Sequence, residues 1–138
     1  MKKLVEQVAA DKAQRRTCFI INPQSGKALD VNDGGHKNGT NIHLWDRNNT
    51  AAQVWKIESD GSIKNPRSEK CVDVEWNKHK NGTNIHLWEK NGTAAQRWRF
   101  ENDGSIIHID SGKALDVSGG GHKNGTNIHL WDRNGTGA

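Results

Sequence analysis

Short stretches of alternating hydrophobic and polar residues predict β-strands along most of the chain, because successive side chains of a strand point to opposite faces of a sheet. The stretch ALDV places Leu29 and Val31 on one face and Asp30 on the other. Further strands are predicted at 41–45 and 53–57. Asn-Gly and Asp-Gly pairs between such stretches predict tight turns. The pattern favours a fold built from many short strands.

The strand NIHLW predicts which side chains lie inside. Ile42 and Leu44 are expected in the core, whereas Asn41, His43 and Trp45 are expected to face outward. In the predicted strand 53–57, the same alternation places Trp55 in the core. Trp98, in the similar stretch QRWRF, is expected in the core for the same reason.

The chain also repeats itself. The decapeptide HKNGTNIHLW occurs three times, starting at residues 36, 79 and 122, with a spacing of 43 residues. A period of this length indicates a repeat architecture or a closed three-fold fold, and three units are too few for a propeller. Each unit carries about four short strands, and three such units can close around a pseudo-three-fold axis. The repeats are 20–62, 63–105 and 106–138.

The third repeat stops early, because Ala138 aligns with Ala95 and the strand equivalent to QRWRF is absent. A missing strand would leave an unpaired sheet edge. Residues 1–16 carry an amphipathic stripe that predicts a short helical extension, preceding a domain at 17–138. That extension could cover the gap, join a second copy in a dimer, belong to a neighbouring domain, or be a solvated tail.

Composition narrows the class of protein. The length of 138 residues indicates one domain. The net charge is +4, but the Lys and Arg residues are spread through the chain with 16 acidic residues among them, which disfavours nucleic-acid binding. Since no stretch approaches the ~20 apolar residues of a membrane span, we expect no membrane insertion. Glu6 and Asp11 interrupt the apolar start, so we expect no cleaved signal peptide and a cytoplasmic or non-classically exported protein. Two cysteines form no disulfide framework.

The outward residues suggest the chemistry of sugar binding. A pyranose has one face of C–H groups that packs on an indole such as Trp45. A carboxylate such as Asp30 can accept hydrogen bonds from two adjacent hydroxyls. Three equivalent pockets favour repeated binding over catalysis, which normally needs one asymmetric acid–base pair. We therefore predict a noncatalytic protein without a cofactor, and the histidine spacing predicts no metal site.

Several motifs recur in register and resemble those of ricin-type lectins. These are the ALDV or CVDV strand, the NGTNIHLW strand fifteen residues later, and the signature Gln-x-Trp, present as QVW and QRW. The resemblance covers roughly 20–138 and implies an all-β fold, a β-trefoil, with up to three sites for galactose-type or related glycans. The alternative is a nonlectin trefoil that binds protein or has a structural role.

The resemblance also implies a role for each site residue. Asp30 would bind the hydroxyls, Trp45 would be the stacking platform, and Gln53 would orient the carboxylate. His43 and Asn48 would lie at the rim. The equivalent residues of the second and third sites are Asp73, His86, Trp88, Asn91, Gln96, Asp116, His129, Trp131 and Asn134.

The sequence departs from the family pattern in two respects. The usual disulfide of a repeat would pair Cys71 with the position that Lys90 occupies. Many galactose-binding members have Asn before the signature Gln, where this chain has Ala52 and Ala95. In the second repeat Trp76 replaces a turn residue, and it could form a second wall of that site or cover a loop.

Overall fold

The computed structural model describes residues 5–8 and 17–133. Within these parts the chain forms β-strands and single turns of 3-10 helix, so the predicted all-β class is confirmed. No helix in the described residues is long and apolar enough to cross a membrane. The strands are β1 (Val5–Val8), β2 (Thr17–Ile21), β3 (Ala28–Val31), β4 (Ile42–Trp45), β5 (Trp55–Ile57), β6 (Ile63–Asn65), β7 (Lys70–Val74), β8 (Ile85–Glu89), β9 (Trp98–Phe100), β10 (Ile106–His108), β11 (Ala114–Val117) and β12 (Ile128–Trp131).

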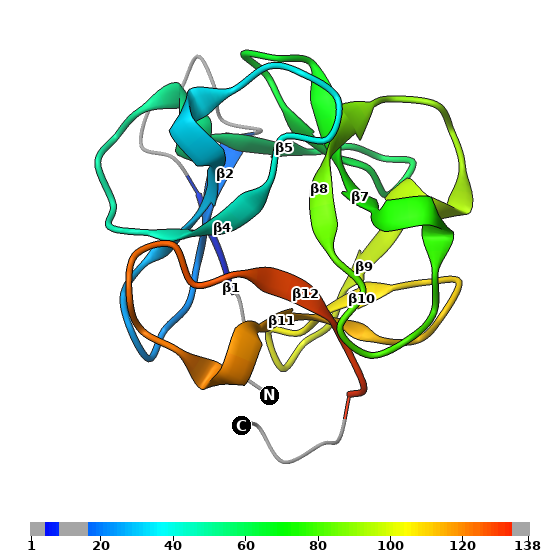
Figure 1. Ribbon diagram of the computed structural model, residues 1–138. Coiled ribbons are helices and arrows are strands. Elements are labelled where there is room, and N and C mark those ends of the chain that lie inside the picture. The colour runs from blue at the N-terminus through cyan, green and yellow to red at the C-terminus, as the bar shows by residue number, and fades with distance from the viewer. Residues whose placement is uncertain (1–4, 9–16, 134–138) are drawn as a thin grey trace.

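The three repeats form three leaves around a central axis, with β4, β8 and β12 next to it (Figure 1). All strand pairs are antiparallel, and their order is β4-β3-β2-β5-β6-β7-β8 in one sheet and β12-β11-β10-β9 in the other. The last strand of a repeat pairs with the first strand of the next, β5 with β6 and β9 with β10. This arrangement confirms the predicted β-trefoil.

The core draws equivalent side chains from every repeat. Ile42 and Leu44 are fully buried, as the alternation predicted, and Trp55 and Trp98 lie in the same cluster. Each core indole donates its N–H to a backbone carbonyl, Trp55 to Leu29 at 3.0 Å and Trp98 to its equivalent carbonyl at 3.1 Å. Their polar atoms are thus satisfied inside the core.

The helix predicted at the N-terminus is wrong where the structure describes that segment. Val5–Val8 form β1, which pairs with β2 over four residues, and the remainder of 1–16 lies outside the described residues. The physical reason is that β2 presents an edge whose N–H and C=O groups need partners. A short segment with β-branched valines at both ends, Val5 and Val8, satisfies them better as a strand.

β1 occupies, against β2, the position that β5 and β9 occupy against the first strands of the second and third repeats. Glu6 lies opposite Ile20. Where β9 of the second repeat pairs with β10 of the third, Phe100 lies opposite Ile106. Ile106 is the residue of the third repeat that corresponds to Ile20 in the first. β1 and β9 therefore hold the same register against the first strand of the following repeat. The edge of β2 that was expected to be open is thus paired by a segment of the same chain.

Three asparagines close the molecule at the axis. Asn41 donates to Asn127 at 2.8 Å, Asn127 donates to Asn84 at 2.8 Å, and Asn84 donates back to Asn41 at 2.9 Å. Asn41 was expected to face outward beside Trp45, but it belongs instead to this ring of amides. Each repeat supplies one donor and one acceptor, so the ring needs the same residue three times.

The rest of the decapeptide also joins neighbouring repeats. The N–H of Gly39 donates to Leu87 at 2.7 Å, and the N–H of Leu87 donates to Thr40 at 2.8 Å. Asn38 accepts from the N–H of Glu89 at 2.8 Å. The equivalent contacts recur at both other junctions. The identity of the decapeptide thus has a structural reason, because one surface must fit its neighbour three times.

His108 is a buried exception to the repeat, at the position of Asn65 in the preceding unit. Its Nε2 lies 2.9 Å from the carbonyl of Ala94 and its Nδ1 lies 2.7 Å from the hydroxyl of Ser111. A neutral ring satisfies both contacts, with Nε2–H as donor and Nδ1 as acceptor. Burial lowers the pKa of His108, and nearby His79 lowers it further.

We expect His108 to make the fold sensitive to acid. Because its folded pKa lies below its unfolded value of about 6.5, its contribution is complete above that pH. It is lost as pH falls toward the folded pKa, at no more than about 1.4 kcal/mol per pH unit. In His108→Asn, which restores the residue of the preceding repeat, this part of the pH dependence should disappear. Urea unfolding between pH 5 and 8 measures it, and parallel curves for the two proteins would contradict the assignment.

Candidate functional site

Each repeat places a buried aspartate directly opposite a histidine on the neighbouring strand. Asp30 of β3 is paired with His43 of β4, and the carboxylate oxygen lies 3.0 Å from Nε2. The same register joins the equivalent pairs, Asp73 with His86 at 2.8 Å and Asp116 with His129 at 2.9 Å. Side chains directly opposite on antiparallel strands are close neighbours. The thirteen-residue spacing from Asp to His therefore builds a charge-assisted hydrogen bond.

The histidine also supports the tryptophan two residues later. The rings of His43 and Trp45 are stacked, with centroids 5.3 Å apart and planes inclined by 26°. The other two repeats show the same stack. Trp45 and Trp131 are 40% exposed, and Trp88 is half-buried. An indole supported in this way presents an apolar surface beside the aspartate. Its partial exposure agrees with the predicted outward orientation of Trp45.

A glutamine at the same position of the first two repeats donates to the other carboxylate oxygen. Gln53 lies in the 3-10 turn η3 (Ala51–Gln53) and is fully buried. Its amide donates to Asp30 at 2.9 Å and to the carbonyl of Asp46 at 2.8 Å, and its oxygen accepts from the N–H of Asn48 at 3.1 Å. Gln96 in η5 (Ala94–Gln96) makes the equivalent three bonds. The predicted orienting contact is present in both repeats.

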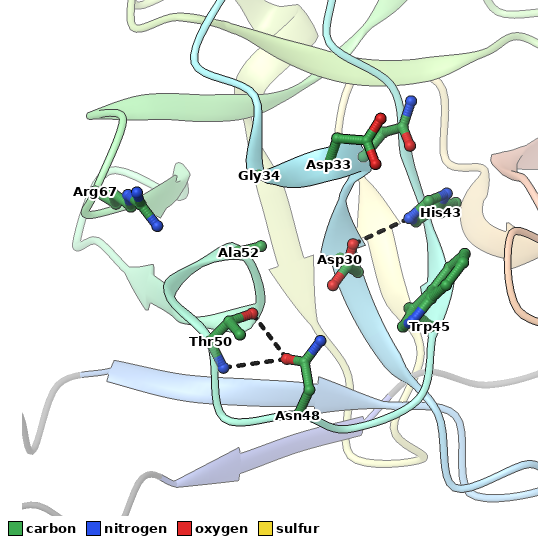
Figure 2. A pocket seen from close by; sticks show the side chains of 10 residues that line it. Asp30, Asp33, Gly34, His43, Trp45, Asn48, Thr50, Ala52 and Arg67 are labelled. Carbon is green, nitrogen blue, oxygen red and sulfur yellow. Dashed lines mark hydrogen bonds and ion pairs between the residues drawn. The ribbon is translucent and has the colours of Figure 1, made fainter.

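Asn48 presents a donor beside the carboxylate. Its Oδ1 accepts from both the N–H and the hydroxyl of Thr50, at 3.1 and 2.7 Å. The side-chain oxygen is thereby occupied, and the NH₂ group is the part of the amide turned toward Asp30 (Figure 2). Asn91 and Thr93 repeat this arrangement. The Asn-x-Thr triplet is thus a turn that positions an amide donor.

These groups line cavities in the first two repeats. The first cavity has a volume of about 430 Å³ and the second about 650 Å³. Figure 2 shows Asp30 at the centre of the first, with Trp45 and His43 on one side, Asn48 below and Arg67 opposite. The second is lined by Gly39, Asp73, Val74, Glu75, Trp76, Asn77, His86, Trp88, Asn91, Thr93 and Ala95.

The structure brings most of the predicted residues together but corrects the place of several. His43 and His86 do not form an exposed rim: each is 7% exposed and lies beneath its tryptophan. Asp30, Asp73 and Asp116 are also buried, at 5–6% exposure, instead of pointing into solvent. A charged group buried in this way requires hydrogen-bond partners, and the histidine supplies one. Asn134 lies outside the described residues.

Other cavity-lining residues carried no sequence signal that identified them. Thr50, Asp33 and Arg67 line the first cavity, and Gly39 reaches the second from the preceding repeat. A single glycine gives no indication of which neighbour it will contact. Ala52 and Ala95, at the position before the signature glutamine, lie at the two cavities as well.

The cysteines and the nearby charges have structural roles. Cys18 and Cys71 are buried, and burial raises the pKa of the Cys71 thiol to about 11, so this thiol stays protonated at neutral pH. Lys90 pairs with Glu58 at 3.1 Å and with Asp60 at 3.0 Å. It thereby connects the end of β8 to the turn before β6.

Among the described residues, no three His, Cys, Asp or Glu side chains gather as a metal site would require.

The arrangement leaves the carboxylate ready to accept further hydrogen bonds. A carboxylate offers about four lone-pair positions. In Asp30 one oxygen accepts from His43 and the other from Gln53. Each oxygen keeps acceptor capacity toward the cavity, and the carboxylate plane is already fixed. Together with a neighbouring amide donor and an indole face, this geometry can hold a small polyhydroxylated ring without reorganisation.

The comparisons agree with this architecture. The family described as Ricin-type beta-trefoil lectin domain matches residues 16–138. A designed three-fold symmetric protein, ThreeFoil, shares 27% identity with a TM-score of 0.83, over 88% of this chain and 92% of that one. An exo-β-1,3-galactanase of Clostridium thermocellum shares 25% identity with a TM-score of 0.76, over 98% of this chain but 28% of the enzyme.

A third structure supports the fold alone. The C-terminal half of an earthworm R-type lectin, solved with GalNAc, shares 18% identity with a TM-score of 0.72, over 88% of this chain and 92% of that one. A search of curated proteins finds no match.

Gln53 allows the orientation of the carboxylate to be tested. We expect Gln53→Met to lower the free energy of unfolding by about 1–3 kcal/mol, because it leaves buried polar groups without partners. It should also weaken ligand binding at the first site while leaving the second unchanged. Gln96→Met is the matched control, with the opposite site affected. Urea unfolding and ligand titration measure both effects, and equal losses at both sites in either variant would contradict the local role.

Proposed function

The chain belongs to the ricin-type β-trefoil lectin family, and we propose that it binds carbohydrate without catalysis, through up to three equivalent sites that accept galactose-type or related glycans. The observation that carries the proposal is the carboxylate of Asp30, which is held by His43 and Gln53 beside a partly exposed indole. Sugar hydroxyls would donate to this carboxylate, and the C–H face of the ring would pack on Trp45.

The preorganised site reduces what binding costs. Asp30, His43 and Gln53 are already buried and hydrogen-bonded to one another, so the ligand does not have to order them. The exposed NH₂ group of Asn48 would donate to a third hydroxyl. Its position supports a galactose-type preference even though Ala52 stands where many galactose-binding members have asparagine. The likeness to part of an exo-β-1,3-galactanase agrees with this sugar class.

Repetition favours binding over catalysis. The second and third repeats present the same Asp–His pair and stacked tryptophan as the first. A hydrolase would need a distinct acid and base with separated pKa values at one bond, whereas a lectin gains from copies. A single shallow site with a dissociation constant near 1 mM supplies only about −4 kcal/mol. Copies on one rigid body can raise the affinity for a glycan-rich surface by about 10²–10⁴.

The proposal is tested by retention on immobilised galactose and elution with free galactose. We expect the parent protein to be retained strongly, whereas variants that keep one of Asp30, Asp73 and Asp116, with Asn at the other two, should bind the surface about 10²-fold or more weakly. Their affinity for free methyl β-galactoside, per remaining site, should be unchanged. Passage of the parent through galactose and xylan columns alike would support a protein-binding trefoil instead. A one-site variant that is retained as tightly as the parent would show that multivalency is not what the repeats provide.

A further inference from the structure

Trp76 has a backbone conformation that is unusual for its residue type. It lies in the 3-10 turn η4 (Glu75–Asn77) with φ 56° and ψ 17°. The equivalent residues are Asp33, with φ 52° and ψ 22°, and Gly119, with φ 60° and ψ 13°. This left-handed region is natural for glycine and accessible to aspartate, but a bulky residue is strained there. The scaffold therefore dictates the conformation, and the second repeat places an indole in it.

The fold gains little from that indole. Trp76 is 81% exposed, the largest value among the exposed hydrophobic residues of the described chain. A large apolar side chain left in water forgoes the stabilisation that burial would give. Strain and exposure at one residue indicate a role outside the folding of the chain.

The loop that carries Trp76 is fixed by the third repeat. Asn77 donates to Asp110 at 3.1 Å, and His79 lies 3.1 Å from the same carboxylate oxygen. The position equivalent to Asp110 one repeat earlier is Arg67, which lines the first cavity instead. The loop of the second repeat is thus anchored through a contact specific to that repeat, which keeps Trp76 at the cavity.

The second cavity has two indoles where the first has one. Trp76 and Trp88 both line it, together with Asp73 and Glu75. The first cavity has Asp33 at the position of Trp76 and is smaller, about 430 Å³ against 650 Å³. The first cavity also has a more polar lining than the second. The second site therefore offers a larger ligand a second aromatic surface on the side of the aspartate occupied by η4.

We propose that the second site binds a glycan of at least two sugar units, the first on Trp88 and Asp73 and the adjoining unit on Trp76. The inference rests on the proposed sugar-binding function and adds a selectivity for oligosaccharides at one of the repeats. An adjoining pyranose would cover the exposed indole with its own C–H face. Trp76 is thus a specificity-determining residue, and the first and second sites differ in the length of glycan they prefer.

The test uses titration calorimetry on a protein in which only the second site keeps its carboxylate, through Asp30→Asn and Asp116→Asn. The probes are methyl β-galactoside and the three methyl galactobiosides with β-1,3, β-1,4 and β-1,6 linkages. We expect at least one disaccharide to bind about tenfold more tightly than the monosaccharide. Trp76→Asp should abolish this gain and leave the monosaccharide affinity unchanged. Because aspartate already adopts this conformation at position 33, the variant should melt no lower than its parent.

The reciprocal test introduces a tryptophan at the equivalent position of the first site. With Asp73→Asn and Asp116→Asn in place, Asp33→Trp should raise the affinity of the first site for the same disaccharide and not for the monosaccharide. Monosaccharide binding without any Trp76-dependent gain would overturn this inference and leave the proposed function standing. Equal loss of both affinities in Trp76→Asp would also overturn it, because the residue would then belong to the first sugar position. Absence of binding by every probe would overturn this inference, and passage of the parent through both the galactose and the xylan columns would overturn the proposed function as well.

Discussion

A buried carboxylate without hydrogen-bond donors is too costly for a fold to keep, and this requirement connects the core of each repeat to its surface. Asp30 receives one donor from β4 and another from η3. The register of β3 against β4 and the position of the loop that follows are therefore fixed by one side chain. Gln53 extends the connection, because it also donates to the carbonyl of Asp46 and accepts from the N–H of Asn48. The group best suited to bind a sugar is the group that organises the repeat.

Much of this could be predicted from the sequence. Alternation placed Ile42, Leu44 and Trp55 in the core, and all three are fully buried. The recurrence of motifs in register predicted three repeats and the trefoil. The contact between Gln53 and Asp30 followed from the family resemblance, and the geometry has it at 2.9 Å. These features depend on neighbours within one repeat, where a period of two and fixed spacings carry the information.

Most of what could not be predicted depends on contacts between repeats. A strand period distinguishes two faces, but it does not tell an outward residue at the axis from one at a cavity, so Asn41 was grouped with Trp45. One error lies within a repeat: the family resemblance placed His43 at the rim, although the stacked indole of Trp45 covers that ring. The N-terminal segment shows the same limit. Its apolar spacing favoured a helix, whereas the free edge of β2, a property of the closed trefoil, makes β1 a strand.

The six tryptophans of the chain provide the most direct measurement of the central claim, that sugars bind at the outer indoles and carboxylates while the core stays unchanged. Their indole N–H signals can be followed separately by two-dimensional NMR and assigned with single Trp→Phe variants. On titration with methyl β-galactoside, the account predicts saturable shifts for Trp45, Trp88 and Trp131. Trp55 and Trp98, whose N–H groups are bonded to core carbonyls, should not move. Unchanged signals for all three outer indoles, with shifts confined to the core pair, would contradict it.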